Sequence, residues 1–414
     1  MDEKKVLLIT TINQRESTRE TYLRETEARS LIHTLGLEVG HHQQFTIKEE
    51  NPNTFIGMGQ AAEAAMVAEE LQLDEVIINV FLTPRQEKNL EKIFGLPVSD
   101  RENLILSIFF QNAHSKEARL QIMKAEAEYL KPRLQNREDN LSQQRGGVRG
   151  AKGEGERKIE LQRRFLSERI AQLEREIEEV RRVREVQRKG RKDGSIFSFA
   201  LVGYTNAGKS SIMKALTGSD VLVEDKLFAT LDTTTRALTL PNTQKVLLSD
   251  TVGFIQDLPH RLISAFSSTL DEALDASAVI IVLDLSHPAV YTTFETTRDT
   301  LEELGALDKI RLLVLNKVDQ QYDDISLARL QNLGIPYVVT SVKENIGLDS
   351  LLEKMADITE EEYITLTLHC DVSGKIYGRL PKDTLILSAD YKDDALLLKV
   401  RIRREMESYC RSLV

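Results

Sequence analysis

Gly-Tyr-Thr-Asn-Ala-Gly-Lys-Ser at residues 203–210 is the segment that decides the fold of this chain. An apolar run at 195–202 precedes it and a helical run at 211–216 follows it. In this order of strand, glycine-rich turn and helix, the pattern GxxxxGK(S/T) forms a loop whose N–H groups bind phosphate. The flanking strand and helix disfavour the alternative, a glycine turn without a ligand. The segment predicts a nucleoside triphosphate site with Lys209 at the β- and γ-phosphates and Ser210 at Mg²⁺.

Length and composition limit the class of protein. The chain has 414 residues, which predicts two to four domains, and its 41% hydrophobic and 29% charged residues are typical of a soluble globular protein. The sequence has no apolar run near the ~20 residues of a membrane span and no apolar stretch long enough for a signal peptide. The two cysteines, Cys370 and Cys410, lack metal-ligand spacing and suggest a reducing compartment. We therefore expect a cytoplasmic protein.

Charge is segregated along the chain. The net charge is −10, but residues 131–193 carry 19 Lys and Arg residues against 12 Asp and Glu residues. That segment has a charge of +7, so the remainder has a charge of −17. An acidic body with a basic middle segment predicts a local contact with a polyanion rather than a globally basic binder.

Strand-like and helical runs alternate at the N-terminal end. Residues 5–11, 43–48 and 75–80 have strand patterns, and helical patterns lie between them. This order predicts a small parallel sheet flanked by helices. The glycines of Gly57-x-Gly59 raise the alternative of a dinucleotide site. Because a third glycine and an acidic partner at the expected distance are missing, the pattern favours a plain tight turn.

A helical hairpin is expected before the phosphate-binding pattern. Residues 103–134 have one long helical pattern, and residues 145–156 carry five glycines interleaved with charged residues. Such a glycine-rich segment cannot bury a core and predicts a mobile loop. The next helix places apolar residues at steps of four and three, which is the seam of a two-helix contact. This seam predicts an antiparallel hairpin with the loop at its tip, and it comprises Leu166, Ile170, Leu173, Ile177 and Val180.

The basic part of the hairpin, residues 131–192, has two interpretations. One is a solvated two-helix spacer whose charges keep it soluble. The other is an arm that carries a flexible tip into folded RNA, where Arg and Lys side chains meet phosphates. The tip has no aromatic residues for base stacking, so the second interpretation predicts contact with the RNA backbone rather than sequence readout.

The alternation of strands and helices resumes at residue 195, and strand-like runs dominate after Thr359. The predicted fold class is α/β, with a P-loop domain that has a mainly parallel sheet. A small α/β domain with a long helical hairpin precedes it, and a small α+β domain follows it. We predict the N-terminal domain at 1–102, the hairpin at 103–192, the P-loop domain at 193–358 and the C-terminal domain at 359–414.

Residues 250–253, Asp-Thr-Val-Gly, follow an apolar strand at the position of a magnesium and γ-phosphate contact. Asp250 would hold Mg²⁺ through water, and the N–H of Gly253 would meet the γ-phosphate. A threonine from the segment between the two motifs would complete the contacts to Mg²⁺. The spacing of twenty residues to Asp250 favours Thr230 over the other candidates, which are Thr233, Thr234 and Thr235.

Two later segments predict the choice of base. Residues 316–319, Asn-Lys-Val-Asp, end an apolar strand. The Asp319 carboxylate can accept two hydrogen bonds from the guanine N1 and N2 donors, a pair that adenine lacks. This residue therefore predicts selection of GTP. Residues 341–343, Ser-Val-Lys, follow the next strand, where their backbone would receive the base O6.

The residue after Gly253 is Phe254, which cannot hydrogen-bond a water molecule. Many GTPases place a water-orienting Gln there. Gln256 and Arg236 are in-chain alternatives that the sequence does not support. We therefore predict slow intrinsic hydrolysis that a partner accelerates. The Asn206 side chain suggests a further hypothesis, a K⁺ ion held near the phosphates.

These segments together define the predicted site. The predicted catalytic residues are Lys209, Thr230 and Gly253, and the magnesium ligands are Ser210, Thr230 and, through water, Asp250. The predicted nucleotide-binding residues are Gly203, Tyr204, Thr205, Asn206, Ala207, Gly208, Lys209, Ser210, Phe228, Ala229, Thr230, Leu231, Asp232, Asp250, Thr251, Val252, Gly253, Asn316, Lys317, Val318, Asp319, Ser341, Val342 and Lys343.

With these residues in view, the chain resembles the HflX family of translation-associated GTPases, in the class that also contains the Obg proteins. Outside the P-loop domain the resemblance rests on Phe55-Ile-Gly, Asp100-Arg101 and residues 128–134. Inside that domain it rests on GYTNAGKS at 203–210, LFATLDTTTR at 227–236, DTVGFI at 250–255 and NKVD at 316–319.

The resemblance implies GTP-dependent association with the large ribosomal subunit, and it favours the hairpin as an RNA-binding arm. It also implies that Thr230 and Ser210 are the magnesium ligands. Three departures from the family pattern bear on these implications. Thr233 stands where Pro is usual, Gln60 stands where Lys is common, and the tip at 152–157 lacks the Pro and Thr of the family's RGPGET.

Two functions remain open from the sequence. The first is a monomeric GTPase that binds large-subunit ribosomal RNA through the hairpin and acts in ribosome dissociation, rescue or biogenesis. The second is a non-ribosomal GTPase switch whose hairpin binds a protein partner. A third function, assistance in RNA modification, would need a second catalytic site. The sequence offers no cysteine, metal or methyl-donor constellation to supply one.

Overall fold

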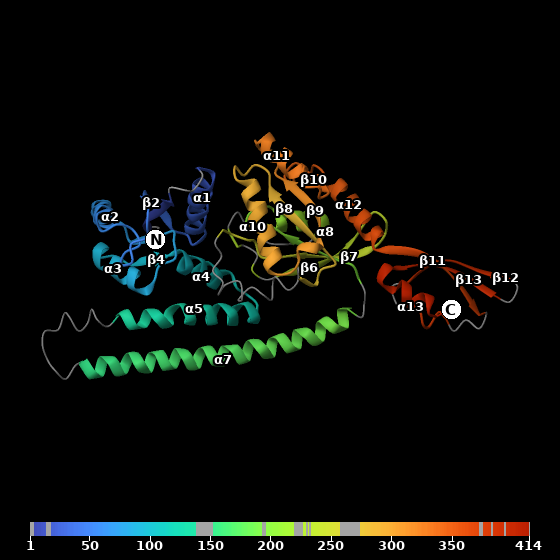
Figure 1. The fold of residues 1–414 in the computed structure, drawn as a ribbon, viewed down its shortest axis with the longest axis horizontal. Coiled ribbons are helices and arrows are strands. Elements are labelled where there is room, and N and C mark those ends of the chain that lie inside the picture. Colours follow the sequence, from blue (N-terminus) through green and yellow to red (C-terminus); the bar gives the residue numbers. More distant parts are fainter. Residues whose placement is uncertain are drawn as a thin grey trace.

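The computed structural model has three sheets and one long helical hairpin (Figure 1). The hairpin runs beneath the first two sheets, and the third sheet lies at the C-terminal end. No helix among the described residues is long and apolar enough to cross a membrane. The structure describes residues 4–13, 18–137, 152–192, 196–218, 227–228, 231, 233–256, 274–371, 376–381, 384–392 and 395–413.

The N-terminal sheet has the strand order β2-β1-β3-β4, and every pairing in it is parallel. This confirms the prediction of a small parallel sheet. Its strands are β1 (Lys5–Asn13), β2 (Glu38–Ile47), β3 (Glu75–Ile78) and β4 (Val98–Asp100). Its helices are α1 (Thr18–Thr34), α2 (Met58–Glu70), α3 (Pro84–Phe94) and α4 (Arg101–Asn112).

The strand β1 divides its side chains between two cores. Successive side chains of a strand point to opposite faces. Val6 and Leu8 pack with α1 and α4, whereas Leu7 and Ile9 pack with α2 and α3. A fully buried strand of this kind needs helices on both faces, which explains its nearly continuous apolar sequence.

The helix α3 has local signals in its sequence at both ends. The Thr83 hydroxyl accepts from the Gln86 N–H, and Pro84 occupies the first turn, where a missing N–H costs nothing. Gly95 ends the helix in the left-handed region with φ of 66°. The helix holds Leu90 and Phe94 against the sheet.

The hairpin consists of α5 (Lys116–Arg137) and α7 (Lys152–Lys192), which lie side by side (Figure 1). Its contact buries Leu173 and Ile177 of the predicted seam against Leu120. Lys124 of α5 also forms an ion pair with Glu174 of α7, at 3.0 Å. The antiparallel two-helix contact is therefore present in the described residues.

The prediction of one helix over 103–134 is wrong. The helix α4 ends at Asn112, and Ala113 adopts an extended conformation with ψ of 118°. The Ser115 hydroxyl then accepts from the Ala118 N–H and starts α5, because a serine oxygen competes for backbone donors at a helix start. At its other end α5 runs past Pro132 to Arg137.

The predicted tip loop is partly helical. The helix α7 begins at Lys152, so residues 152–156 of the segment predicted as a loop belong to a helix. Residues 145–151 lie outside the described part of the chain. The two glycines at 153 and 155 therefore do not prevent helix formation, although each lowers helix propensity by about 1 kcal/mol relative to Ala.

The central sheet has the strand order β10-β9-β8-β5-β7-β6. Its pairings are parallel except that of β6 with β7, which is antiparallel. Its strands are β5 (Ser198–Val202), β6 (Thr234–Thr239), β7 (Lys245–Asp250), β8 (Ala278–Asp284), β9 (Ile310–Asn316) and β10 (Tyr337–Val339). Its helices are α8 (Lys209–Thr217), α10 (Val290–Glu303), α11 (Asp324–Gln331), α12 (Leu348–Glu361) and the short η1 (Leu307–Lys309).

One apolar core spans the N-terminal and central sheets. Leu31 of α1 and Phe109 of α4 belong to the same buried cluster as Phe228 and Phe254 of the central part. The rings of Phe109 and Phe228 meet edge to face with centroids 4.5 Å apart, an arrangement that aromatic pairs prefer. The helices α1 and α4 of the N-terminal part are therefore packed against Phe228 and Phe254 beside the phosphate loop.

The C-terminal sheet is antiparallel, with the order β11-β13-β12. One face of it is covered, where Leu396, Leu398 and Val400 of the middle strand pack with Cys410. The sequence predicts this small α+β arrangement, and the structure confirms it. Its elements are β11 (Tyr363–Asp371), β12 (Leu385–Lys392), β13 (Ala395–Arg403), η2 (Arg404–Met406) and α13 (Glu407–Arg411).

Candidate nucleotide-binding site

The glycine-rich loop joins the central strand β5 to the N-terminus of α8. Gly203 has φ of 148°, and a Cβ there would lie 2.2 Å from the Val282 carbonyl oxygen. Gly208 has φ of 97°, and a Cβ there would lie 2.2 Å from the Asn316 Nδ2. Both positions therefore require glycine for conformation and for space. The loop leaves its N–H groups at a helix N-terminus, where an anion is stabilised.

Lys209 is buried at the start of α8. Its Nζ donates to the carbonyl oxygens of Gly203, at 3.1 Å, and Tyr204, at 2.9 Å. Burial lowers the pKa of Lys209 to about 8, and the charge of Asp250 partly opposes that shift. An anionic phosphate in the loop would restore the charged form, which is the state that can neutralise phosphate oxygens.

Two of the three residues predicted for magnesium, Ser210 and Asp250, lie together. The Ser210 hydroxyl donates to Oδ2 of the fully buried Asp250 at 2.6 Å. A hydroxyl and a carboxylate at this separation are the hard oxygen donors that Mg²⁺ takes, together with substrate phosphates and water. Thr205 contributes a buried Oγ1 that has no hydrogen-bond partner among the described residues. The site therefore fits a magnesium ion and a phosphate group.

The segment after β7 packs directly on the phosphate loop. The Phe254 N–H donates to the Gly203 carbonyl at 3.0 Å, and the Thr205 N–H donates to the Phe254 carbonyl at 2.8 Å. A Cβ at Gly253 would lie 2.7 Å from the Thr205 Cα, so this contact also depends on glycine. The Phe254 side chain is buried in the core and not directed to solvent. A movement of Gly253 on contact with a γ-phosphate would therefore also move the phosphate loop.

The predicted base-recognition residues form one network at the ends of β9 and β10. The Asn316 Nδ2 donates to the Ala207 carbonyl at 3.0 Å, which ties this network to the phosphate loop. The Ser341 hydroxyl donates to Oδ1 of Asp319 at 2.6 Å and lowers the pKa of that exposed carboxyl. Asp319 therefore stays ionised and orientated, as an acceptor of two guanine donors must be.

The contact between Lys317 and Asp284 was not anticipated from the sequence. Lys317 has φ of 64° and forms an ion pair with Asp284 of β8 at 2.7 Å. This pair fixes the lysine stem beside the base-recognition network. Asp284 ends its strand next to the end of β9, with Asp284 opposite Asn316 in the sheet register. Adjacency of strand ends could have indicated the pair, but the strand order is not visible in the sequence.

A second missed feature connects the site with the N-terminal sheet. The Tyr204 hydroxyl donates to Glu27 of α1, and Glu27 also accepts from Arg101 of α4. The Gln256 N–H donates to the Tyr204 hydroxyl oxygen at 2.7 Å, and the Gln256 carbonyl accepts from Arg101 at 2.7 Å. Burial and Glu27 raise the pKa of Tyr204, so the phenol keeps its proton.

The structure brings most of the predicted site residues together, and it leaves a few undescribed. Ala229, Thr230 and Asp232 lie outside the described residues, so the threonine prediction stays a prediction. Asn206 is exposed with φ of 60°, and the K⁺ hypothesis also stays open. The residues that the fold gathers around the loop are Gly203–Ser210, Asp250–Gly253, Asn316–Asp319 and Ser341–Lys343, with Phe228 and Leu231 buried beside them.

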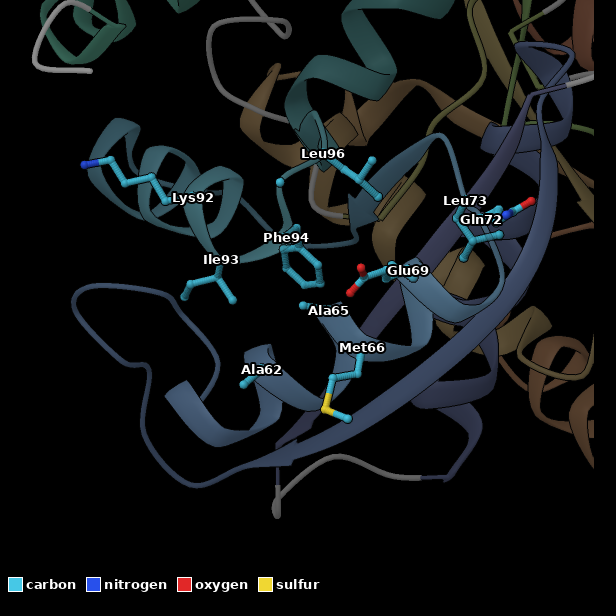
Figure 2. Close-up of a pocket in the computed structure, with 12 residues that line it drawn as sticks. Ala62, Ala65, Met66, Glu69, Gln72, Leu73, Lys92, Ile93, Phe94 and Leu96 are labelled. Atoms are coloured by element: carbon cyan, nitrogen blue, oxygen red, sulfur yellow. The ribbon is translucent and has the colours of Figure 1, made fainter. Parts of the chain in front are cut away.

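The N-terminal glycine turn has a structural role in the described contacts. The Gly57 N–H donates to Oε1 of Gln60 at 2.9 Å at the start of α2. Figure 2 shows a groove of about 630 Å³ between α2 and α3. Neither Gly57 nor Gly59 lines it, and apolar side chains such as Met66 and Ile93 do. The Gln60 side chain occupies the Gly57 N–H, which favours the plain turn over a dinucleotide site.

Three features define the chain as a P-loop GTPase. They are the phosphate loop, the residues Ser210 and Asp250 that fit one Mg²⁺ ion, and the Asn-Lys-x-Asp network at the strand ends. A family model described as 50S ribosome-binding GTPase matches residues 198–317. Two more family models match the part of the chain that precedes it. GTP-binding GTPase N-terminal matches residues 23–110, and GTP-binding GTPase Middle Region matches residues 112–191.

The relatives identify the family within that class. A GTPase HflX of Caldanaerobacter subterraneus is 37% identical, and the match covers 100% of this chain and 94% of that protein. A GTPase HflX of Treponema denticola is 42% identical over 84% of this chain and 91% of that protein. The crystal structure of SsGBP in complex with GDP matches with a TM-score of 0.51 and 26% identity, over 86% of this chain and 99% of that chain. The chain belongs to the HflX family of GTPases.

Proposed function

We propose that this GTPase binds the large ribosomal subunit in its GTP state, with the hairpin α5/α7 as the RNA-contacting arm. The observation that carries the proposal is the combination of a GTP site with a long helical hairpin in one chain. Residues 131–193, which include most of that hairpin, have a net charge of +7. A basic projecting element is the footprint of phosphate contact. The matched family model is described as a 50S ribosome-binding GTPase, which supports this partner. Ribosome dissociation, rescue or biogenesis would be the cellular setting, in the cytoplasm.

The chemistry of GTP hydrolysis gives roles to the predicted catalytic, magnesium-binding and base-selecting residues. Lys209 would contact the β- and γ-phosphates, and the Gly253 N–H would stabilise the γ-phosphate as charge develops on it. Ser210, Thr230 and, through water, Asp250 would hold Mg²⁺, which neutralises charge on the β- and γ-oxygens. Asp319 would select guanine.

Slow intrinsic hydrolysis follows from Phe254, whose ring is buried where many GTPases place a water-orienting Gln. Arg236, one of the two in-chain candidates for a substitute, makes no side-chain hydrogen bond or ion pair with the phosphate loop among the described residues. The Arg236 guanidinium is exposed and donates to its neighbour's carbonyl on Thr235 at 3.1 Å. A partner must therefore order the site or supply a catalytic group. We also retain the hypothesis of a K⁺ ion near Asn206, which a comparison of hydrolysis rates in K⁺ and Na⁺ buffers would test.

Ribosome sedimentation tests the proposal. The full chain is centrifuged with ribosomes in the presence of GDP, GTP or a non-hydrolysable GTP analogue. We expect co-sedimentation with the analogue and little with GDP. Replacement of the tip cations by Ala should reduce binding and its salt dependence, because a complex with fewer phosphate contacts releases fewer counterions when it forms. The cations to replace are Arg145, Arg149, Lys152 and Arg157.

A charge-matched variant provides the control. Four exposed cations outside the hairpin are replaced by Ala, so that the net charge changes equally. Unchanged ribosome binding by the tip variant would contradict the proposal and favour a hairpin that binds a protein. An equal loss in both variants would show a general charge effect instead, which also contradicts it. The control positions are Lys48, Lys354, Lys399 and Arg411.

A further inference from the structure

The dipeptide Asp100-Arg101 lies between the hairpin and the nucleotide site, and no step of nucleotide chemistry uses it. Asp100 is the last residue of β4 and Arg101 is the first residue of α4. Both side chains are buried, with 0% and 3% of their surface exposed. They point to different partners, so one peptide unit joins two separate networks. We call these two residues the coupling pair.

Asp100 holds the base of the hairpin. Its carboxylate accepts from the Tyr129 hydroxyl at 3.0 Å and from the Arg133 guanidinium at 3.0 Å, both on α5. Arg133 also donates to Glu87 at 2.6 Å and to the Leu82 carbonyl at 2.9 Å. Its guanidinium lies 3.4 Å from the centre of the Tyr129 ring. The helix α5 is therefore fixed to the N-terminal sheet by charges that have little access to water.

Arg101 holds the segment that follows the γ-phosphate motif. Its guanidinium donates to Asn79 at 2.8 Å, to Glu27 and to the Gln256 carbonyl at 2.7 Å. Gln256 lies three residues after Gly253 in the sequence. This part of the N-terminal sheet is the crevice at the carboxyl ends of β1 and β3, where the strand order reverses and doubly wound folds take ligands.

Tyr204 completes the connection to the phosphate loop. Its hydroxyl donates to Glu27 and accepts from the Gln256 N–H, and its carbonyl accepts from Lys209 at 2.9 Å. A side chain of the phosphate loop therefore joins the network of Glu27 and Arg101 beside the N-terminal sheet. The chain of contacts runs from α5 through the coupling pair and Glu27 to the residues that would touch the nucleotide.

Buried charges make this connection stiff. Displacing one partner of a buried charged pair leaves an uncompensated charge, so such contacts are kept or broken and do not slide gradually. A movement of α5 against the N-terminal sheet must therefore break the Asp100 contacts or carry Asp100 with it. Because Arg101 is the next residue, its contacts with Glu27 and Gln256 would move as well.

We propose that Asp100 and Arg101 couple the position of the hairpin to the phosphate loop, so that hairpin contacts set the rate of nucleotide release. Both are positioning residues, since neither lies at the reacting atoms. Loosening the hairpin side frees Tyr204 and Gln256 and speeds release. Binding free energies are coupled reciprocally, so nucleotide in turn biases the hairpin. The extension to ribosomes, in which docking of the hairpin changes GDP affinity, rests on the function proposed above.

The test measures release of a fluorescent GDP from the full chain, with ribosomes absent. Tyr129→Phe removes one hydroxyl from Asp100, and Arg133→Gln removes the guanidinium. Neither residue touches the phosphate loop in any described contact. We expect GDP to dissociate about 5- to 50-fold faster in both variants, a typical range for coupling between sites. If Arg133→Gln does not fold, Tyr129→Phe carries the test.

A control and a double variant separate coupling from general damage. Lys124→Gln removes an ion pair inside the same hairpin, between α5 and α7, and should leave GDP release within about 1.5-fold of the original rate. Tyr204→Phe breaks the other end of the connection. Combined with Tyr129→Phe, it should give an effect smaller than the product of the two single effects, since both act on one chain of contacts.

Two results would overturn the proposal. One is a folded Tyr129→Phe variant whose GDP release stays within twofold of the original rate. The other is a double variant whose effects multiply fully. Both measurements omit ribosomes, so failure of ribosome sedimentation would leave this inference standing. Conversely, unchanged GDP release would leave ribosome binding by the tip unaffected.

Discussion

The N-terminal sheet and the central sheet are built alike, yet they use their glycine turns differently. Both are mainly parallel and buried on two faces, and both place a glycine turn before a helix. In the central sheet, Gly203 and Gly208 adopt positive φ, and a Cβ at either position would collide with Val282 of β8 or Asn316 of β9. In the N-terminal sheet, Gly57 has φ of −60° and its N–H is capped by the Gln60 side chain. A glycine pair therefore indicates a phosphate site only where the backbone demands glycine.

The crevices of the two sheets differ in the same way. The carboxyl ends of β7 and β9 carry Asp250 and Asn316, which lie beside the phosphate loop and Ser210 of α8. At the corresponding end of the N-terminal sheet, Glu27 and Arg101 bind the Tyr204 hydroxyl and the Gln256 backbone. One sheet thus presents a ligand site, and the other receives the first sheet's loop. A change in the conformation of the phosphate loop would therefore act on the N-terminal sheet through these contacts.

The strongest test of this comparison exchanges glycine for alanine in each turn. Gly208→Ala places a Cβ 2.2 Å from the Asn316 Nδ2 at φ of 97°, so we expect GTP affinity to fall by more than about 100-fold. Gly57→Ala is the matched control, since its Cβ would meet only the flexible Gln60 side chain, at 3.2 Å and beyond. Its GTP affinity should change less than about twofold. Isothermal titration of both variants decides, and an equal loss in both would refute the distinction.

A second test concerns the contact between the two sheets. Arg101→Met leaves the buried Glu27 carboxylate without its guanidinium, and loss of one partner of a buried ion pair typically costs about 3–5 kcal/mol of unfolding free energy. The control is Arg164→Ala, which removes an exposed ion pair with Glu168 and should cost less than about 1 kcal/mol. Urea denaturation followed by circular dichroism measures both. Equal denaturation midpoints would show that the crevice contact does not stabilise the fold.

A third test concerns base selection, which belongs to the central sheet alone. Asp319→Asn replaces one acceptor of the carboxylate by a donor, which no longer matches the guanine N1 and N2 donors. Because a hydrogen bond to a charged group contributes about 1.5–3 kcal/mol, we expect GTP affinity to fall by about 10- to 100-fold or more. Xanthosine triphosphate, which has a carbonyl in place of the N2 amine, should bind this variant better than the original protein. Competition between the two nucleotides measures the preference, and unchanged GTP preference would exclude Asp319 from base contact.

The sequence could predict what depends on neighbouring residues. The phosphate loop and the seam of α7 follow from short-range patterns, and the structure confirms the order of strand, loop and helix and the seam contact. The break between α4 and α5 was missed because a serine start signal at Ser115 lies inside an otherwise continuous helical pattern. The boundaries of the four predicted domains stay predictions.

The sequence could not predict what depends on distant residues. Glu27 and Tyr204 are 177 positions apart, and their contact exists only because α1 and the phosphate loop pack into one core. Nothing local marks Glu27 as a partner of Tyr204. The same holds for Asp284, which meets Lys317 because β8 and β9 are neighbours in the sheet. The nucleotide residues carry local motifs, whereas the contacts between sheets do not.

The smallest expected effect is the pH dependence of nucleotide binding, which would sharpen the view of the central loop as an anion site. Burial lowers the pKa of Lys209 to about 8 in the protein without nucleotide, and phosphate contact favours its charged form. At pH 7 roughly nine tenths of the molecules already hold a charged lysine, so binding takes up only roughly a tenth of a proton. At pH 8.5 roughly three quarters of the molecules hold a neutral lysine, so binding should take up roughly three quarters of a proton.

The affinity should change in the same direction. The affinity for GDP at pH 8.5 should be about fourfold lower than the affinity measured when Lys209 is fully charged. The loss grows as the pH rises further towards the pKa of Lys209 in the complex. Titration calorimetry at pH 7 and pH 8.5, in two buffers of different ionisation enthalpy, measures the proton uptake directly. If uptake is absent at pH 8.5, Lys209 is charged before nucleotide arrives. In that case its hydrogen bonds to the loop carbonyls, and not its burial, would control its charge.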